Sequence, residues 1–506
     1  MQSRTFDKSE IKTGKCTSVL RDSSIETVQS FLSRLLDREK LKSCEECGVC
    51  TGACPVASMV PDKYNPRLLL ENSALNLAET LKERGLWLCA RCYTCYDRCP
   101  QMIDLPEIFS QIRRFSAESG YLSDSTSGLD EALKVIQEEI PLPAIYAWLC
   151  LYPDKLNSQS REIDKVIVEK LKSFVADRMA KKVTPPTRVH NERIAIIGSG
   201  PAGLTAACEL ATKGYSVTVF ESLPVLGGML GVGIPDYRLS KEALEAELAY
   251  ISSLGVKIRT DVTVGRDVKV DELLKEGYGA IFIATGAHES VNLDIEGKQQ
   301  TGVFQALDLL KKLSMGERVE LGEKVAVIGG GNVAIDVART ALRLNAKDVN
   351  ILYRRSRAEM PANPSEVRDA EMDGAKIHFL VQPTKIVGNG KRVVGVECIR
   401  VQLGELDETG RRQLIPVESS DYTIDVDTII LAIGCTSDLS FLPKDVAITG
   451  RNTIAVDPVT LETSSPGIFA GGDVVSGPAS VVNALVAGKR AACSIDRRLR
   501  GEIETW

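Results

Sequence analysis

The sequence contains few histidines and no long apolar run, and each of these shortages excludes a class of function. His190, His288 and His378 are its three histidines. His190 falls in a polar linker and we interpret the other two as structural, so no catalytic histidine is predicted. No apolar run reaches the ~18 residues of a membrane-spanning helix, and the longest candidate, 141–152, contains prolines. Residues 1–15 lack the apolar core of a signal peptide, so we expect a cytoplasmic protein with no transmembrane segment.

An excess of basic residues is also lacking. The 62 Lys and Arg residues are outnumbered by 68 Asp and Glu residues, and the formal net charge is −6. Nucleic-acid binding depends on a basic surface, so no nucleic-acid partner is expected. The 506 residues allow about three domains at ~150 residues each, and 44% of apolar residues is enough to fill several cores.

Cysteine, by contrast, is abundant, and eight of the fourteen cysteines form two runs with the same spacing, C-x2-C-x2-C-x3-C. The first run consists of Cys44, Cys47, Cys50 and Cys54, and the second of Cys89, Cys92, Cys95 and Cys99. A proline follows each run, which is the bacterial ferredoxin pattern for two 4Fe–4S clusters.

In two-cluster ferredoxins the last cysteine of one run ligates the other cluster. The sequence therefore predicts one cluster on Cys44, Cys47, Cys50 and Cys99, and a second on Cys89, Cys92, Cys95 and Cys54. The alternatives are zinc sites and a disulfide framework. Zinc sites are usually built from two C-x2-C pairs, and disulfides are rare in cytosolic proteins, so neither alternative is favoured.

Helices are predicted around the two runs. Apolar residues recur at helical spacing in 24–36, and residues 66–83 and 104–117, which flank the second run, are also predicted to be helical. Residues 129–180 are typical of helices interrupted at 141–153. The six remaining cysteines are scattered and are interpreted as small apolar residues: Cys16, Cys150, Cys208, Cys398, Cys435 and Cys493.

After a polar, proline-containing linker at 181–190, β-branched runs alternate with glycine clusters and helical stretches, which is typical of parallel α/β sheets. A strand at 194–197 precedes a glycine-rich turn and a helix, and the next strand ends in Glu221, about 20 residues on. The turn contains Gly198, Gly200, Pro201, Ala202 and Gly203. Such glycines let the backbone approach a pyrophosphate at the helix N-terminus, and the acid accepts a ribose hydroxyl. This fingerprint predicts a dinucleotide site.

A second contact with the same cofactor is predicted near the C-terminus. Gly472 and Asp473 follow a strand at 467–470. An acid so far along the chain suits a second contact with a long cofactor, which indicates FAD.

A second fingerprint follows a strand at 325–328 and contains Gly329, Gly331, Asn332 and Val333. The next strand, 349–353, ends in Arg354 and Arg355 instead of an acid. An acid repels the 2′-phosphate of NADP, whereas arginine pairs with it. The sequence therefore predicts that this site prefers NADP over NAD; the alternative is a solvated pair of surface arginines.

No catalytic residue is predicted in either nucleotide site. Hydride passes directly from nicotinamide to flavin, and the protein mainly positions the two rings. The α/β part of the sequence contains no C-x-x-C motif, so a redox disulfide of the thioredoxin reductase type is not expected.

Residues 140–506 resemble the small, β-type subunit of NADPH-dependent glutamate synthase. The matching segments are 197–203, 227–230, 233–239, 284–286, 329–336, 353–361, 467–473 and 478–483. The resemblance implies an FAD domain interrupted by an NADP domain, with Arg354 and Arg355 on the 2′-phosphate. It also implies cofactor contacts from the matching segments by Gly228, Arg238, Thr285, Gly286 and Ser480.

The sequence departs from that family at one place. In the family, the helical segment before the FAD fingerprint carries its own cluster cysteines, whereas 140–178 retains only Cys150 here. We expect the two upstream runs to replace those clusters. Residues 30–125 resemble the C subunit of heterodisulfide reductase, most clearly over 86–101 and 64–67. In that family the dicluster subunit passes electrons to a separate catalytic subunit.

The predicted architecture is an α/β flavoprotein with two Rossmann-like domains, preceded by a mainly helical dicluster ferredoxin-like domain. The predicted limits are 1–125 for the dicluster domain, 126–190 for a helical connector and linker, 191–300 with 426–506 for the FAD domain, and 301–425 for the NADP domain.

The predicted function is that of an iron–sulfur flavoprotein oxidoreductase. It would move electrons between NADP(H), FAD, two 4Fe–4S clusters and a redox partner. That partner would be a catalytic subunit like that of heterodisulfide reductase or the glutamate synthase large subunit, or a ferredoxin. The alternative is an electron-input subunit of a larger complex, of heterodisulfide reductase or bifurcating transhydrogenase type, with little activity alone. The start, Met1-Gln2, has no amidotransferase nucleophile, so we do not expect the chain to make glutamate alone.

Overall fold

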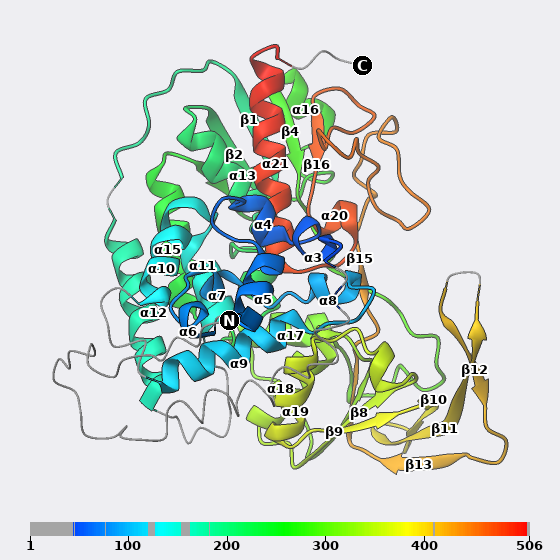
Figure 1. Cartoon of the computed structure of the whole chain (residues 1–506). Coiled ribbons are helices and arrows are strands. Elements are labelled where there is room, and N and C mark those ends of the chain that lie inside the picture. Colours follow the sequence, from blue (N-terminus) through cyan, green and yellow to red (C-terminus); the bar gives the residue numbers. More distant parts are fainter. Residues whose placement is uncertain are drawn as a thin grey trace, which may run out of the picture.

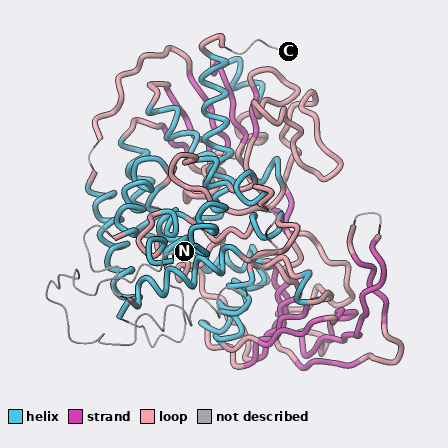
Figure 2. The backbone as a smooth tube through the Cα atoms, in the orientation of Figure 1, coloured by secondary structure: helices cyan, strands magenta, loops and turns pink. Residues whose placement is uncertain are grey.

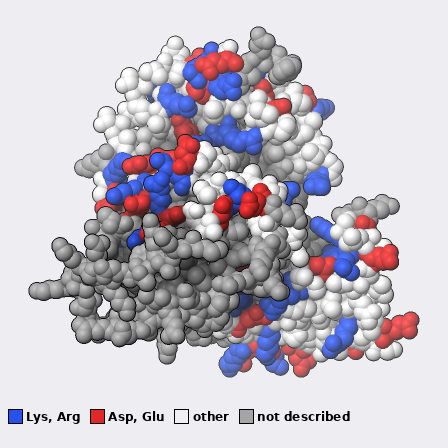
Figure 3. Space-filling view, in the orientation of Figure 1, with Lys and Arg blue, Asp and Glu red and all other residues white. Residues whose placement is uncertain are grey.

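The computed structural model describes residues 44, 46–75, 77–119, 127–152, 162–181, 183–407 and 410–502. The predicted helix at 24–36 and Cys16 lie outside these residues. In Figure 1 the N-terminal helices lie beside the first α/β domain, and the second α/β domain lies at the lower right. Basic and acidic side chains are interspersed over the described part of the face drawn in Figure 3. Among the described helices, none is long and apolar enough to cross a membrane.

The first α/β domain contains a five-stranded parallel sheet in the order β16-β4-β1-β2-β3. Its strands are β1 (Arg193–Ile197), β2 (Ser216–Phe220), β3 (Lys257–Arg259), β4 (Tyr278–Ile283) and β16 (Ile468–Ala470). Helices α13 (Pro201–Thr212) and α21 (Val481–Leu499) pack against each other beside this sheet. The residues of β1 after its first are all buried, as in a parallel sheet covered on both faces.

The second α/β domain contains a parallel sheet in the order β6-β14-β7-β8-β9. Its strands are β6 (Val303–Gln305), β7 (Lys324–Ile328), β8 (Asp348–Tyr353), β9 (Lys376–Phe379) and β14 (Thr428–Leu431). Helix α18 (Asn332–Arg343) packs between α17 (Ala306–Ser314) and α19 (Pro364–Asp373).

An antiparallel sheet extends from the second domain at the lower right of Figure 2. It consists of β10 (Val381–Gly388), β11 (Val393–Leu406), β12 (Arg412–Pro416) and β13 (Tyr422–Asp425).

The chain crosses between the two α/β domains at β5 (Glu289–Ser290) and β15 (Cys435–Thr436), which pair antiparallel. The predicted boundaries between the FAD and NADP domains, at residues 300 and 426, both differ from these crossings. Ile295 already packs in a core of the second domain, and β14 pairs with β6 and β7 of the second sheet. An apolar strand has the same pattern in either sheet, so the sequence does not show which one it joins.

The N-terminal part is built of short helices. They are α3 (Val49–Gly52), α4 (Pro55–Met59), α5 (Pro66–Leu75), α6 (Leu77–Thr80), α7 (Gly85–Leu88), α8 (Thr94–Arg98) and α9 (Leu105–Glu118). Helices α5 and α6 both lie within the helix predicted at 66–83. Helix α9 begins after Asp104, whose carboxylate accepts the amide N–H of Glu107 at 3.1 Å and caps the helix.

Three connector helices join these N-terminal helices to the first α/β domain: α10 (Gly128–Glu139), α11 (Pro143–Leu151) and α12 (Glu162–Ala180). The prediction of an interruption at 141–153 is wrong for α11, because a proline at the first helical position sacrifices no hydrogen bond. Helices α11 and α12 pack on α15 (Lys241–Ser253), while α10 packs on α7. One hydrophobic core therefore continues from the cysteine runs into the first α/β domain.

Candidate functional site

The two cysteine runs form loops with matching backbone conformations. Glu46 and Arg91, each immediately before the second cysteine of its run, have left-handed φ values of 53° and 50°. Gly48 and Tyr93, immediately after that cysteine, have φ values of 75° and 59°. The repeated spacing in the sequence is therefore a repeated loop in the structure.

The fourth cysteine of each run also has an equivalent environment. The amide N–H of Ala57 points to Cys54 Sγ at 3.5 Å, and that of Ile103 points to Cys99 Sγ at 3.4 Å. Amide donors stabilise a thiolate relative to a thiol. Both sulfur atoms are therefore placed to act as anionic ligands.

Cys54 lies beside the second run. Burial, together with the nearby Cys92 and Cys89 thiols, raises the pKa of the Cys54 thiol to about 12. This arrangement fits the crossed ligation, in which Cys54 completes the set on Cys89, Cys92 and Cys95. Among the described residues, no group of three or more His, Cys, Asp or Glu is spaced to hold a single metal ion. In a 4Fe–4S cluster each thiolate binds a different iron.

Crossed ligation can be tested with matched serine variants. Replacing Cys99 should damage the cluster whose other ligands are Cys44, Cys47 and Cys50, and replacing Cys54 should damage the other one. The measurement is cluster-resolved EPR of the reduced protein, with each variant as the control for the other. If Cys99→Ser instead alters the signal assigned to its own run, the crossed arrangement is wrong.

A single cavity of about 1660 Å3 joins the second cysteine run to both α/β domains. From the first α/β domain it is lined by the residues predicted to contact FAD: Gly198, Gly200, Pro201, Ala202, Glu221, Gly228, Arg238, Thr285, Gly286, Gly472, Asp473 and Ser480. From the dicluster part it is lined by Trp87, Arg91 and Cys92, and from the second domain by Asn332 and Val333. The cavity therefore brings a cluster ligand and the predicted FAD site into one space.

The glycine-rich turn fits a dinucleotide. A Cβ atom at Gly198 would lie 2.5 Å from the carbonyl oxygen of Ala284, and one at Gly203 would lie 2.0 Å from that of Gly198. Gly203, which does not line the cavity, therefore allows α13 to approach the turn. The hydroxyl oxygen of Thr285 is buried in the cavity wall with no partner among the described residues. A bound cofactor offers such an atom a hydrogen bond.

Glu221 already has four hydrogen-bond donors. Its Oε2 accepts the amide N–H of Ser199 at 2.9 Å and the Ser199 hydroxyl at 2.6 Å. Its Oε1 accepts the amide N–H of Leu223 at 2.9 Å and the Ser222 hydroxyl at 3.3 Å. A carboxylate has about four acceptor positions. A ribose hydroxyl at Glu221 would therefore replace the hydroxyl of Ser199 or of Ser222 as a donor.

The C-terminal segment places further polar groups at the cavity. Burial raises the pKa of the Asp473 carboxyl to about 6, and the amide N–H of Ala479 donates to it at 3.2 Å. Ser480 caps α21, and its side chain accepts the amide N–H of Asn483 at 3.3 Å. The N-terminus of this 19-residue helix thus faces the cavity, where its dipole favours an anion.

The second fingerprint lies at the N-terminus of α18. A Cβ atom at Gly329 would lie 2.1 Å from the carbonyl oxygen of Ala432, whereas Gly331 borders open space. The Asn332 side chain accepts the amide N–H of Asn363 at 2.8 Å. The fingerprint glycines lie outside the walls of the cavity that Asn332 lines.

The two arginines after β8 differ in their environment. Arg354 is exposed, and it makes no hydrogen bond or ion pair within the described part of the chain. Arg355 donates to the carbonyl oxygen of Arg412 at 2.7 Å and lies 3.7 Å from the Glu359 carboxylate. Neither arginine lines the cavity.

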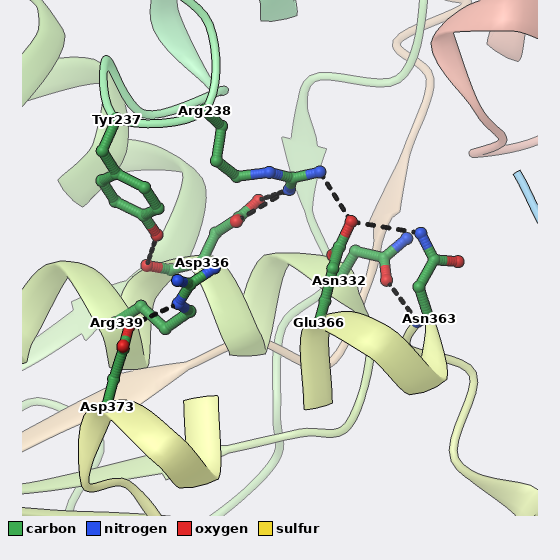
Figure 4. Close-up of polar contacts among 8 residues, drawn as sticks. All are labelled: Tyr237, Arg238, Asn332, Asp336, Arg339, Asn363, Glu366 and Asp373. Carbon is green, nitrogen blue, oxygen red and sulfur yellow. Dashed lines mark hydrogen bonds and ion pairs between the residues drawn. The ribbon is translucent and has the colours of Figure 1, made fainter. Parts of the chain in front are cut away.

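Arg238 forms a partly buried ion-pair network between the two α/β domains (Figure 4). Its guanidinium donates to both carboxylate oxygens of Asp336 at 2.8 Å and to Glu366 at 2.7 Å. The Tyr237 hydroxyl donates to the Asp336 carbonyl oxygen at 3.2 Å. We predicted Arg238 as a cofactor contact; in the structure it lines the cavity while its guanidinium is paired with the opposite domain. No sequence motif indicated Asp336 or Glu366 as its partners.

The three histidines have different environments. His288 lines the cavity beside Gly228 and Gly286, and burial lowers its pKa. His378 lies 2.8 Å from the Asn350 side chain between neighbouring strands. His190 stacks on the ring of Tyr215 at 4.0 Å. The position of His288 in the cavity had no signal in the sequence, because it belongs to none of the fingerprints.

Comparisons with known proteins define the class. Residues 192–488 match the pyridine nucleotide-disulphide oxidoreductase family. Residues 40–103 match the 4Fe-4S dicluster domain. The Mycobacterium tuberculosis protein FprA in complex with NADPH has the same fold, with a TM-score of 0.51 and 21% identity over 63% of this chain and 87% of that one.

The chain is similar over most of its length to three characterised proteins. It is 41% identical to the NADP(+)-dependent formate dehydrogenase subunit beta of Moorella thermoacetica, over 81% of this chain and 62% of that one. It is 37% identical to the NADPH-Fe(3+) oxidoreductase subunit beta of Geobacter sulfurreducens, over 80% of this chain and 63% of that one. It is 32% identical to the glutamate synthase small chain of Azospirillum brasilense, over 90% of this chain and 97% of that one. The chain thus spans less than two thirds of the first two relatives.

The fold and the cofactor sites define an iron–sulfur flavoprotein oxidoreductase. The chain belongs to the pyridine nucleotide-disulphide oxidoreductase family and carries a 4Fe-4S dicluster domain at its N-terminal end. Its cofactors are FAD, NADP(H) and two 4Fe–4S clusters. The predicted resemblance to the glutamate synthase small subunit and the predicted fold class are confirmed.

Proposed function

We propose that the protein moves electrons between NADP(H) and a partner redox protein by way of FAD and its two 4Fe–4S clusters. The observation that supports this most directly is the shared cavity, whose walls contain Cys92 of the dicluster part, the first fingerprint turn and the N-terminus of α18. When bound, the cofactors supply hydride transfer and one-electron transfer. The role of the protein is to hold them next to one another and away from bulk water.

The residues around the cavity have defined tasks in this proposal. Those for FAD are Gly198, Gly200, Pro201, Ala202, Gly203, Glu221, Gly228, Thr285, Gly286, Gly472, Asp473 and Ser480. Those for NADP(H) are Gly329, Gly331, Asn332, Val333, Arg354 and Arg355. The cluster ligands are Cys44, Cys47, Cys50 and Cys99 for the first cluster, and Cys89, Cys92, Cys95 and Cys54 for the second. The second cluster would be nearer the flavin, because Cys92 lines the cavity.

The second candidate is an electron-input subunit with little activity alone. It is favoured by the relatives named as β subunits or small chains. The partner would then be a catalytic subunit, such as a formate dehydrogenase or a glutamate synthase large chain. We place the protein in the cytoplasm, because eight of its fourteen cysteines stand in cluster-type runs and cysteine-rich chains of that compartment use cysteine for metal binding, with disulfides rare there.

The test is anaerobic mixing of the reconstituted protein with NADPH, followed by flavin absorbance and cluster EPR. We expect NADPH to reduce both the flavin and the clusters, and cluster reduction to be lost in protein stripped of FAD. An artificial one-electron dye then separates the two candidates, because turnover of the isolated chain favours an independent oxidoreductase. Clusters that stay oxidised beside fully reduced flavin would contradict the proposed route.

A further inference from the structure

Arg113 of α9 is a buried cation beside the second cysteine run. Its side chain is 7% exposed. Its guanidinium donates to three backbone carbonyls: Leu86 at 2.6 Å, Cys89 at 2.5 Å and Cys150 at 3.4 Å. It also lies 5.8 Å from the centre of the Trp87 ring. Each of these contacts satisfies a donor or fills space, but none supplies a negative charge.

The other two buried arginines in the described part of the chain are paired with acids. Arg178 lies 2.9 Å from Glu247, and Arg339 lies 2.8 Å from Asp373. Within the described residues, no carboxylate forms an ion pair with Arg113. A buried charge without a counter-charge is strongly unfavourable, so the partner of Arg113 is expected to be a bound anionic group.

The second cluster is such a group. A 4Fe–4S cluster held by four thiolates carries a net negative charge and gains another on reduction. The carbonyl group of Cys89 accepts a hydrogen bond from Arg113 directly. In a buried, low-dielectric site a fixed positive charge acts strongly on a neighbouring negative one. Net charge and hydrogen bonding near the cluster are also the factors that set its potential.

We propose that Arg113 is the counter-charge of the second cluster and raises its reduction potential above that of the first. This rests on the proposed function, in which the second cluster is the one nearer the flavin. The first run has no equivalent cation in the described structure. Arg67, the arginine that contacts that run, is 31% exposed and already lies near the carboxylates of Glu46 and Glu71, at 3.8 Å and 3.3 Å. Arg113 thus sets the reduction potential of the second cluster without being one of its ligands.

The test is a redox titration of the reconstituted protein by cluster-resolved EPR, poised with chemical reductants in place of NADPH. In Arg113→Gln, we expect the reduction equilibrium constant of the second cluster to fall at least tenfold, which is 59 mV for one electron. Arg113→Lys should keep most of the potential, because it keeps the charge. The matched control is Arg114→Gln, since Arg114 is 50% exposed and paired with Glu118 at 3.1 Å.

A second variant covers the case in which Arg113→Gln does not assemble. Cys150 is buried beside Arg113, and Cys150→Asp adds the missing carboxylate while Arg113 stays in place. We expect the second cluster to have a lower reduction potential in Cys150→Asp than in Cys150→Asn, the variant with a neutral side chain of the same shape. Unchanged potentials in Arg113→Gln and Cys150→Asp, or equal shifts of both clusters, would overturn the proposal. Because no NADPH is used, failure of the proposed function would not produce these results.

Discussion

Replacing Arg238 with methionine should loosen the second α/β domain from the first. Arg238 is 22% exposed, and it pairs with Asp336 of α18 and Glu366 of α19. Removing one partner of a fully buried ion pair costs about 3–5 kcal/mol, because the remaining charges stay buried without compensation, and this partly exposed pair should lie at the lower end of that range. Since ~1.4 kcal/mol is a factor of ten, local opening of this contact should increase by roughly 100-fold or more.

The effect of Arg238→Met should depend on pH. Burial raises the pKa of the Asp336 carboxyl, and the neighbouring Glu366 raises it further, against the opposing effect of Arg238. Loss of Arg238 should therefore raise that pKa more. The pKa of this carboxyl in the unfolded state is about 4. When the pKa in the folded state is higher, the protonated carboxyl stabilises the folded protein at pH values below the unfolded-state pKa. That stabilisation is lost as the pH rises through the folded-state pKa. The variant should thus be closest to wild type at mildly acidic pH.

Hydrogen exchange measures this opening directly. Amide exchange in α18, α19 and the segment 233–239 should accelerate in Arg238→Met and be partly restored in Arg238→Lys. The matched control is Arg266→Met, because Arg266 pairs with Asp267 at the surface with 72% of its side chain exposed. Unchanged exchange in α19 at neutral pH would show that Arg238 does not hold the two domains together.

The glycine and cysteine motifs were predictable because each depends on backbone geometry set by its own few residues. The turn at Gly198 and the loops at Cys47 and Cys92 are such local features. The partners of Arg238 were not predictable, because Asp336 and Glu366 lie 98 and 128 residues along the chain. Only the packing of the two domains brings them together.

Two other features required the three-dimensional structure. Arg113 belongs to a predicted helix, but its burial behind the second cysteine run depends on α7 and α11. Helix α11 itself was not predicted, because its flanking prolines indicated an interruption. Proline at a helix start and proline in a loop have the same sequence signature, and only the burial of the residues that follow distinguishes them.

Replacing Arg354 and Arg355 with alanine should lower the preference for NADPH by roughly ten- to hundredfold or more. These arginines follow β8, the second strand of the fingerprint sheet, where a nucleotide 2′-phosphate lies in Rossmann-type domains. Charge-assisted hydrogen bonds of this kind contribute ~1.5–3 kcal/mol each. NADH has no phosphate at this position, so its turnover should change little.

The two arginines differ in how available their side chains are to a phosphate, and single variants test this difference. Arg354 is exposed and free to meet a phosphate, so Arg354→Ala should account for most of the lost NADPH preference. Arg355 bonds to the carbonyl group of Arg412 in β12, so Arg355→Ala should also loosen the antiparallel sheet. The measurement is dye reduction with NADPH and with NADH. It is made for the wild type, each single variant and the double variant, and the ratio of the two rates gives the preference for NADPH. A wild type that prefers NADH, or a double variant that loses both activities equally, would show that these arginines do not bind the 2′-phosphate.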